Sequence, residues 1–351
     1  MEQKPISSLQ RVLTALSHRE ADRVPFFLLL TMHGAKELNI SIMEYFSNAE
    51  SVAKGQLLMQ KKYHHDCLYT FFYAALEVEA WGGEVIYVDD GPPNAGTPII
   101  RNHNDISRLT LPSVKDTPCL MKVLNATRIM KENVGDEVPI IGVVMSPFSL
   151  PVMQMGFPAY LELIYNQPEL FKQLMAINQE FCVDWANAQL KAGATALCYF
   201  DPVSSSTIIP RELYLKTGFS IAKSTISRIK GPTATHLASG RCLPIAKDIA
   251  DTGTAVIGVS AEENLVDIKK ICKGKLTILG NLNGIEMSRW DAKHTIAAVK
   301  EAIIKAGSGG GFILSDNHGE IPWQVKEDVL MTMSETVQTY GRYPLVLGER
   351  E

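Results

Sequence analysis

Apolar runs alternate with longer segments of mixed polarity over most of this chain. Residues 255–259 and 276–279 are two such runs, and unbroken apolar runs are typical of strands covered on both faces. The segment between them, about 262–272, predicts a helix, so the three pieces form a parallel strand–helix–strand unit. Polar residues stand directly after the two runs, namely Ser260, Asn281 and Asn283.

The same alternation continues in both directions from this unit. Further strands are predicted at 26–30, 66–72, 139–145, 196–200, 233–236 and 311–314. Helices are predicted within 1–20, where Leu9, Val12, Leu13 and Leu16 share one face, and at about 42–63, 116–133, 159–192, 211–229, 243–250, 292–306 and 324–340. Buried strands separated by helices along the whole chain predict a (β/α)8 TIM barrel, with a doubly wound open sheet as the alternative.

One segment departs from this pattern. Residues 79–101 contain short extended pieces broken by Gly82-Gly83 and Gly91-Pro92-Pro93, which predicts a hairpin-like insertion. The chain has no repeat or linker, so we expect a single TIM-barrel domain over 1–351, with an N-terminal helical extension and this insertion. The glycine-rich run 307–311 precedes a strand and lacks a Lys-Ser/Thr ending, so it predicts a turn and not a phosphate loop.

Composition narrows the class of partner. The net charge is -4 and the Lys and Arg residues are spread along 351 residues, so neither nucleic acid nor a membrane surface is an expected partner. No apolar run approaches the roughly 20 residues of a membrane span, and no signal-peptide pattern opens the chain, so we expect a cytoplasmic protein. The six cysteines are scattered and never form a CxxC pair, which favours reduced, structural thiols.

Candidate chemistry gathers where the predicted strands end. In a barrel of this kind, functional groups lie on the loops after the C-terminal ends of the strands. The residues at these places are Ser146, Tyr199, Asp201, His236, Ser260, Asn281, Asn283, Asp316, Asn317, His318 and Glu320. They predict a pocket for a polar ligand, although Ser, Asp and Asn at such places also cap the following helices.

Two of these residues are histidines, His236 and His318. Each is a candidate metal ligand, a candidate acid or base, or a hydrogen-bonded core residue. Zinc requires three or four nitrogen, sulfur or oxygen ligands close together. Ala238 stands two residues after His236, and the nearest thiol, Cys242, lies in the next helix, so the sequence gives zinc little support.

Several short motifs occur in a fixed order along the chain. They are Arg11-Val12-Leu13-Thr14-Ala15-Leu16 with Asp22-Arg23-Val24-Pro25, residues 77–83, Ser146-Pro147-Phe148-Ser149-Leu150, residues 236–240, Leu279-Gly280-Asn281-Leu282 and Gly310-Gly311-Phe312-Ile313-Leu314. In this order they resemble the uroporphyrinogen decarboxylase superfamily, and specifically its corrinoid-dependent methyltransferase branch. The resemblance covers nearly the whole chain and implies a (β/α)8 barrel.

Two departures from the superfamily patterns limit what can be carried over. The decarboxylases have an Arg-Gln-Ala-Gly-Arg stretch for the carboxylates of their substrate, whereas apolar residues 26–30 follow Pro25 here. The members that methylate coenzyme M bind zinc through His-x-Cys and a late Cys-Gly. Here Ala238 replaces the first Cys and His318 replaces the second, so only His236 matches that zinc set.

The resemblance and its departures together imply methyl transfer from a methylated corrinoid protein to N5 of tetrahydrofolate, as in glycine betaine demethylation. A thiol, with a pKa of about 8.5, is activated as a zinc-bound thiolate, whereas an amine already has a lone pair. We therefore expect tetrahydrofolate as co-substrate and no zinc. The chain lacks an Asp-x-His-x-x-Gly cobalamin motif, so methylcobalamin should arrive on a separate corrinoid-binding partner protein.

The same reading assigns roles to the polar residues. Asp201 and Asn281 are the first choices for the pterin edge, which needs paired donors and acceptors. Further substrate-binding candidates are Asn283, Tyr199, His236 and Ser146, and His318 or Asp316 is expected to take the N5 proton. Two alternatives stay open: a zinc-dependent methylcobalamin:coenzyme M methyltransferase using His236, His318 and a third ligand from Cys242, Asp316 or Glu320, and a noncatalytic barrel that carries a corrinoid or pterin.

Overall fold

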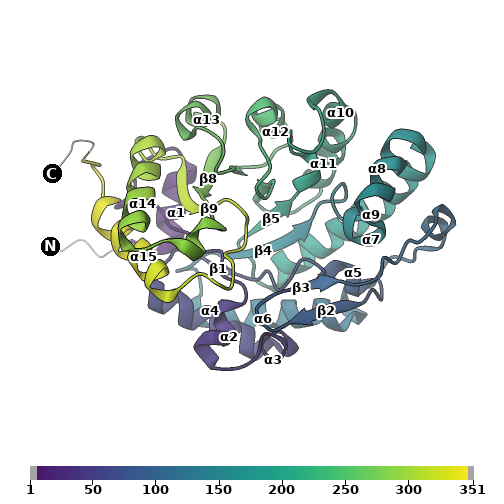
Figure 1. Ribbon diagram of the computed structural model, residues 1–351, viewed down its shortest axis with the longest axis horizontal. Coiled ribbons are helices and arrows are strands. Elements are labelled where there is room, and N and C mark those ends of the chain that lie inside the picture. Colours follow the sequence, from purple (N-terminus) through teal and green to yellow (C-terminus); the bar gives the residue numbers. More distant parts are fainter. Residues whose placement is uncertain (1–5, 347–351) are drawn as a thin grey trace.

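A parallel sheet forms the centre of the protein (Figure 1). The structure is a computed structural model that describes residues 6–346. Seven strands pair in the order β1 (Leu68–Tyr69), β4 (Ile140–Met145), β5 (Ala196–Phe200), β6 (Thr233–His236), β7 (Val256–Gly258), β8 (Thr277–Leu282) and β9 (Phe312–Asp316), and every neighbouring pair is parallel.

The extended segment 25–30 closes the sheet into a barrel. Phe26 bridges to Leu314 of β9 in a parallel sense, and the N–H of Phe27 donates to the Leu314 carbonyl at 2.9 Å. On the other side, the N–H of Asp66, just before β1, donates to the Phe26 carbonyl at 2.7 Å. The segment therefore takes the place of the eighth strand between β9 and β1. The predicted (β/α)8 barrel is confirmed.

Helices surround the strands and mostly match the predicted positions. The longer ones are α1 (Ser8–Leu16), α4 (Ala49–Tyr63), α6 (Pro118–Val134), α8 (Phe157–Asn166), α9 (Pro168–Ala192), α11 (Gly218–Ile226), α13 (Leu265–Cys272), α14 (Ala292–Ala306) and α15 (Glu327–Tyr340). Shorter ones are α2 (His33–Leu38), α3 (Ile42–Ser47), α5 (Leu76–Ala80), α7 (Pro151–Met155), α10 (Arg211–Lys216) and α12 (Ala246–Ala250). Residues 1–5 of the first predicted helix lie outside the described residues.

Two predicted helices are each divided in the structure. The helix expected at 42–63 breaks at Asn48, whose Oδ1 accepts from the Ser51 N–H at 2.8 Å and so caps α4. The helix expected at 211–229 breaks at Thr217, between α10 and α11. A polar residue that satisfies a helix end locally can divide a long amphipathic pattern without exposing its apolar face.

Residues 79–101 contain an antiparallel hairpin of β2 (Val85–Val88) and β3 (Gly91–Ala95). Pro92 and Pro93 lie within β3. The nitrogen of one faces the free edge of the ribbon, and the other is tolerated because the register is irregular opposite them, between Ile86 and Val88. The Nε2 of Gln324 donates to the Asp90 carbonyl at 2.8 Å, so the hairpin turn is tied to the loop before α15.

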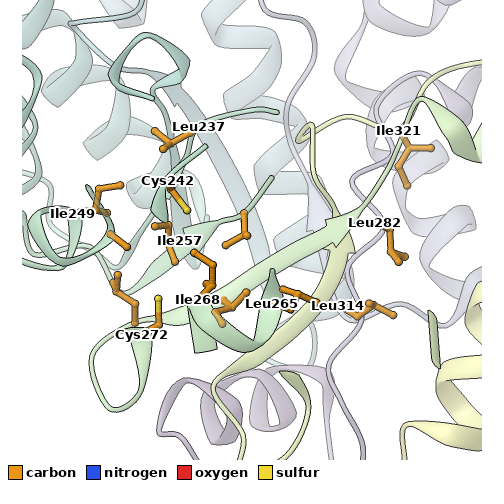
Figure 2. Packing of buried hydrophobic residues seen from close by; sticks show 14 of the residues in the cluster. Leu237, Cys242, Ile249, Ile257, Leu265, Ile268, Cys272, Leu282, Leu314 and Ile321 are labelled. Atoms are coloured by element: carbon orange, nitrogen blue, oxygen red, sulfur yellow. The ribbon is translucent and has the colours of Figure 1, made fainter. Parts of the chain in front are cut away.

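Apolar side chains pack in three clusters. One fills the barrel interior and includes Leu29, Val143 and Ile313, and α1 contributes Val12 to it. The other two lie between the strands and the surrounding helices. Figure 2 shows part of this outer packing, where Ile257 of β7 lies near Ile268 of α13. All six cysteines are buried and unbridged, and no helix within 6–346 combines the length and apolarity needed to cross a membrane.

Two strands are longer than the sequence pattern indicates. β8 continues to Leu282 and β9 to Asp316, with Asn281 paired to Ser315 and Leu282 to Asp316. Asn281 and Asp316 were expected just beyond their strands and instead belong to them. A polar side chain interrupts an apolar run, but the backbone ladder continues because the neighbouring strand still offers hydrogen-bond partners.

Candidate active site

Aromatic rings stack at the C-terminal end of the barrel. Phe200 and His236 are the last residues of β5 and β6 and are paired in register. Their rings are nearly parallel, with centroids 5.3 Å apart and planes at 14°. Phe71, which follows β1, stacks on Phe200, with the two ring centroids 6.3 Å apart. The strand ends therefore present a stack of three rings in the order Phe71, Phe200, His236.

The protonation of His236 follows from one hydrogen bond. The backbone N–H of Ala238 donates to His236 Nδ1 at 3.0 Å, so Nδ1 carries the lone pair and Nε2 carries the proton. Ala238 itself has φ 52°, an uncommon left-handed conformation for a residue other than glycine. Burial lowers the pKa of His236 to about 4, so the ring is neutral at pH 7.

His318 has the opposite tautomer. Its Nδ1 lies 2.7 Å from Asn317 Oδ1, and the Gly284 N–H also donates to that oxygen at 3.2 Å. The second contact fixes the Asn317 oxygen as an acceptor, so His318 Nδ1 is the donor and His318 Nε2 keeps its lone pair. Burial lowers the pKa of this half-buried ring. The site thus has one neutral imidazole that donates through Nε2 and one that accepts through Nε2.

Asp316 is a buried carboxylate with spare hydrogen-bonding capacity. Its Oδ2 accepts from the N–H groups of His318 and Gly319, each at 2.8 Å. Its Oδ1 is buried and has no partner among residues 6–346. Burial raises the pKa of Asp316 to about 6, against the opposing effect of the backbone hydrogen bonds.

Glu320 is a second carboxylate near Asp316. Its Oε1 accepts from the Thr31 hydroxyl, which lies just after the strand that closes the barrel. Burial, helped by the charge of Asp316, raises its pKa to about 7 against the opposing effect of the Thr31 hydrogen bond. Two carboxylates whose charges repel hold a proton more readily near neutral pH than a lone carboxylate does.

Asp201 lies in a network of serines. Its Oδ1 accepts from Ser146 Oγ at 2.6 Å and Ser149 Oγ at 2.7 Å, and its Oδ2 accepts from Ser204 Oγ at 2.6 Å. Burial raises the pKa of Asp201, and the three hydroxyls oppose that shift. Both carboxylate oxygens are occupied, so this group holds together the loops after β4 and β5. Oδ2 has room for one more hydrogen bond, but the carboxylate is enclosed by these loops and the residue is only 1% exposed.

The remaining predicted residues lie elsewhere. Asn281 Nδ2 donates to the carbonyls of Ser260 at 2.9 Å and Glu263 at 3.3 Å, and Asn283 Oδ1 accepts from the Glu286 N–H at 3.2 Å. Both side chains line a hollow of about 230 Å³ beside Trp290 and α14. Tyr199 belongs to the outer cluster with Trp185 of α9, because successive strand residues face opposite sides.

His236, Asp316 and His318 lie in one region. Gly319 directly follows His318, donates its N–H to Asp316 and lies beside the ring of His236. Gly319 has φ 85°, and a Cβ on it would lie 2.7 Å from Phe200 and 3.3 Å from His236. Sequence reasoning missed Phe71, Phe200 and Thr31. Phe200 is the residue after Tyr199, so applying strand alternation to the end of β5 would have indicated it.

Residues 7–340 match the family described as uroporphyrinogen decarboxylase (URO-D). The chain belongs to this family. The resemblance drawn from the short motifs is thereby confirmed, and the match extends from α1 to the end of α15.

Relatives within the URO-D family differ in their activities. The methylcobamide:CoM methyltransferase MtaA of Methanosarcina barkeri is 29% identical over 164 residues, which are 46% of this chain; the chain spans about half, 48%, of that relative's length. The uroporphyrinogen decarboxylase of Hahella chejuensis (strain KCTC 2396) is 24% identical over 336 residues, 89% of this chain and 91% of the relative. A methyltransferase from Methanosarcina mazei shares the fold, with a TM-score of 0.86, 21% identity and coverage of 95% and 99%.

Proposed function

We propose that this protein transfers a methyl group from a methylated corrinoid, carried by a partner protein, to N5 of tetrahydrofolate, without zinc. Methyl transfer from a corrinoid is supported by the relatives that are methylcobamide:CoM methyltransferases, both MtaA and, over 86% of this chain at 23% identity, MtbA of Methanosarcina acetivorans. Decarboxylation of a porphyrinogen is disfavoured by the apolar segment 26–30, which is buried in the barrel wall.

The choice of acceptor rests on the side chains that could serve as metal ligands in this site. Within residues 6–346, no group of three or more His, Cys, Asp or Glu side chains is placed to hold a metal ion. His236 does not fit zinc, because a ligating imidazole nitrogen needs its lone pair and here Nε2 carries the proton while the Ala238 N–H occupies Nδ1. An acceptor that needs no metal, such as a secondary amine, fits this site better than a thiol.

The site also offers hydrogen-bonding groups of both kinds. His236 Nε2 is a donor, and His318 Nε2 and Asp316 Oδ1 are acceptors. The amide and amino edge of a pterin needs such a mixture, and the exposed part of the stack formed by Phe71 and Phe200 offers a flat apolar surface for its ring. Asn281, Asn283, Tyr199, Ser146 and Asp201 remain proposed contacts of lower priority.

When docked, the methylcorrinoid would supply a cobalt-bound methyl carbon that a neutral amine can attack in line, with both electrons of the broken carbon–cobalt bond remaining on cobalt. The residues of this chain then serve to align the amine and exclude water, which accounts for much of the rate in reactions of this kind. The methylated amine carries one surplus proton. His318 Nε2 or Asp316 Oδ1 can accept it, since each has a free lone pair and neither is protonated above about pH 7.

A second candidate is methyl transfer to coenzyme M, which is favoured by the similarity to the methylcobamide:CoM methyltransferases MtaA and MtbA. It would require zinc or another means of holding the thiol as a thiolate. His236 would then have to exchange its tautomer and lose the hydrogen bond from Ala238.

Calorimetric titration of the metal-analysed protein tests the two acceptors. Anaerobic titrations with tetrahydrofolate and with coenzyme M are compared on the same preparation, and methyl turnover is followed with methylcobalamin as donor. We expect tetrahydrofolate to bind and to be methylated by zinc-free protein. Near-stoichiometric zinc with binding of coenzyme M alone would overturn the proposal, and binding without any methyl turnover would indicate a noncatalytic carrier.

A further inference from the structure

His236 Nε2 is an N–H donor without a partner. The residue is 0% exposed, and the atom is buried with no hydrogen-bond acceptor among the described residues. A buried donor left unpaired costs about 1–3 kcal/mol, so proteins rarely retain one that has no use. The other ring nitrogen is already satisfied by Ala238, so the unmet requirement is confined to Nε2.

The ring is also held in one orientation. One face stacks on Phe200, and Gly258, which pairs with His236 in register, packs against the ring edge. A Cβ on Gly258 would lie 2.4 Å from Cδ2 and 2.9 Å from Nε2. Gly319 similarly leaves room near Cε1. The imidazole is therefore fixed by neighbours on several sides, and rotation to satisfy Nε2 within the protein would break the Ala238 hydrogen bond.

We propose that His236 is a binding residue that donates its Nε2–H to an uncharged acceptor atom of the methyl acceptor, such as a carbonyl oxygen or a ring nitrogen of a flat heterocycle. This inference rests on the proposed function and names how the same site recognises its substrate. The Ala238 N–H is the positioning group, because its hydrogen bond determines which ring nitrogen carries the proton.

Two substitutions separate the two nitrogens of the ring. An Asn side chain reaches the position of Nδ1, where its oxygen can accept from Ala238, but it cannot reach the position of Nε2. A Gln side chain reaches the position of Nε2 with an N–H group. His236→Asn should therefore weaken tetrahydrofolate binding about tenfold, the effect of one lost hydrogen bond, and His236→Gln should recover most of that loss.

The readouts keep a structural role apart from a binding role. Affinity is measured by calorimetry, folding by the urea midpoint of each variant, and the tautomer by long-range ¹H–¹⁵N correlation spectra of ¹⁵N-histidine-labelled wild-type protein. We expect a protonated Nε2 and a bare Nδ1 in the free protein, and a change in the Nε2–H resonance on adding tetrahydrofolate. A protonated Nδ1 would overturn the inference.

The remaining outcomes distinguish this inference from the proposed function. If the wild type binds tetrahydrofolate and both variants bind it equally well, the inference fails and the function stands. If the wild type binds tetrahydrofolate without methylating it, and His236→Asn alone weakens that binding, the proposed function fails and the donor role of His236 stands. If both variants lose binding in proportion to lost folding, His236 is only structural and the inference fails.

Discussion

Two buried aspartates at opposite ends of the barrel have very different hydrogen-bond partners. Asp66 lies just before β1, at the N-terminal end of the strands, and Asp316 ends β9 at the C-terminal end. Both are 0% exposed. Asp66 accepts from Arg11 Nη1 at 2.7 Å and Arg23 Nη1 at 2.6 Å, and also from the Ser8 hydroxyl and the Phe26 N–H. Asp316 accepts from two backbone N–H groups and keeps one oxygen unpaired.

The difference suggests that the N-terminal end of the barrel stabilises the fold and that the C-terminal end is available for a ligand. At the N-terminal end, the charge of Asp66 is neutralised and its oxygens are saturated, so the group ties α1 and the closing segment 25–30 to β1. At the C-terminal end, the fold retains an unpaired carboxylate oxygen and an unpaired imidazole N–H. Unpaired buried atoms also occur near the N-terminal end, at His65, Thr233 and Thr277. At the C-terminal end, however, donor and acceptor atoms of His236, Asp316 and His318 lie in one region, which is why we propose that end as the ligand-binding end.

The largest effect on stability is expected at Asp66. Asp66→Ala would leave the side chains of Arg11 and Arg23, which are 9% and 12% exposed, without their shared partner. Breaking a buried ion pair by removing one member typically costs about 3–5 kcal/mol. We expect a loss of that size in the free energy of unfolding, measured by urea denaturation followed by intrinsic fluorescence.

Glu180→Ala is the matched control for Asp66→Ala. Glu180 also pairs with an arginine through two contacts, at 2.8 and 2.6 Å to Arg228, but both side chains are exposed. Solvent-exposed pairs contribute about 0–1 kcal/mol, so this variant should unfold almost as the wild type does. Equal losses in the two variants would contradict the view that Asp66 is the structural centre of the N-terminal end.

Asp316→Asn should have an intermediate, pH-dependent effect of opposite sign. Because the pKa of Asp316 is raised to about 6 in the folded protein, the folded state binds a proton more tightly than the unfolded state does. Its contribution to stability is therefore present at pH 4 and is lost as the pH rises through about 6. Asparagine removes that loss and keeps the hydrogen bonds from His318 and Gly319, so the variant should be about 1–3 kcal/mol more stable than wild type at pH 8 and nearly equal at pH 4.

The same substitution should impair the reaction. Losing a general base commonly lowers a rate by about 10²–10⁴-fold. Because the amine loses its proton only after it is methylated, Asp316→Asn should lower steady-state turnover at pH 8 by about that factor and change the single-turnover rate of methyl transfer much less. Urea denaturation at the two pH values supplies the stability measurement. A variant that keeps the wild-type steady-state rate would remove Asp316 from the reaction and leave His318 as the proposed base.

Much of this architecture was predictable because strands buried on both faces have unbroken apolar runs. The ends of β5 and β6 were predicted at the residues where the structure has them, and parallel strands then place Asp316 and His318 at the same end as His236. The rule that functional groups follow the C-terminal ends of barrel strands then selected these polar residues as site candidates.

The details that decide the chemistry could not be read from the sequence. A run buried on both faces does not reveal that Tyr199 faces the helices and Phe200 the interior. The tautomers of His236 and His318 depend on the direction of the Ala238 N–H and on the Asn317 side chain. The partners of Asp201 are hydroxyls contributed by separate loops. Each of these is a three-dimensional relation with no signature in residue spacing.

The smallest effect is expected at Asp201, which lies at the proposed ligand-binding end but, unlike Asp316, has a partner on each carboxylate oxygen. In Asp201→Asn, the amide oxygen can keep the hydrogen bonds from Ser146 and Ser149, and the amide nitrogen can donate to Ser204 once that hydroxyl rotates. The stability should change by no more than about 1 kcal/mol. Tetrahydrofolate affinity should change by less than about threefold, because three serine hydroxyls already donate to the carboxylate and enclose it. Calorimetry on the stably folded variant checks this, and a tenfold loss would instead place Asp201 in contact with the pterin, as the sequence pattern predicts.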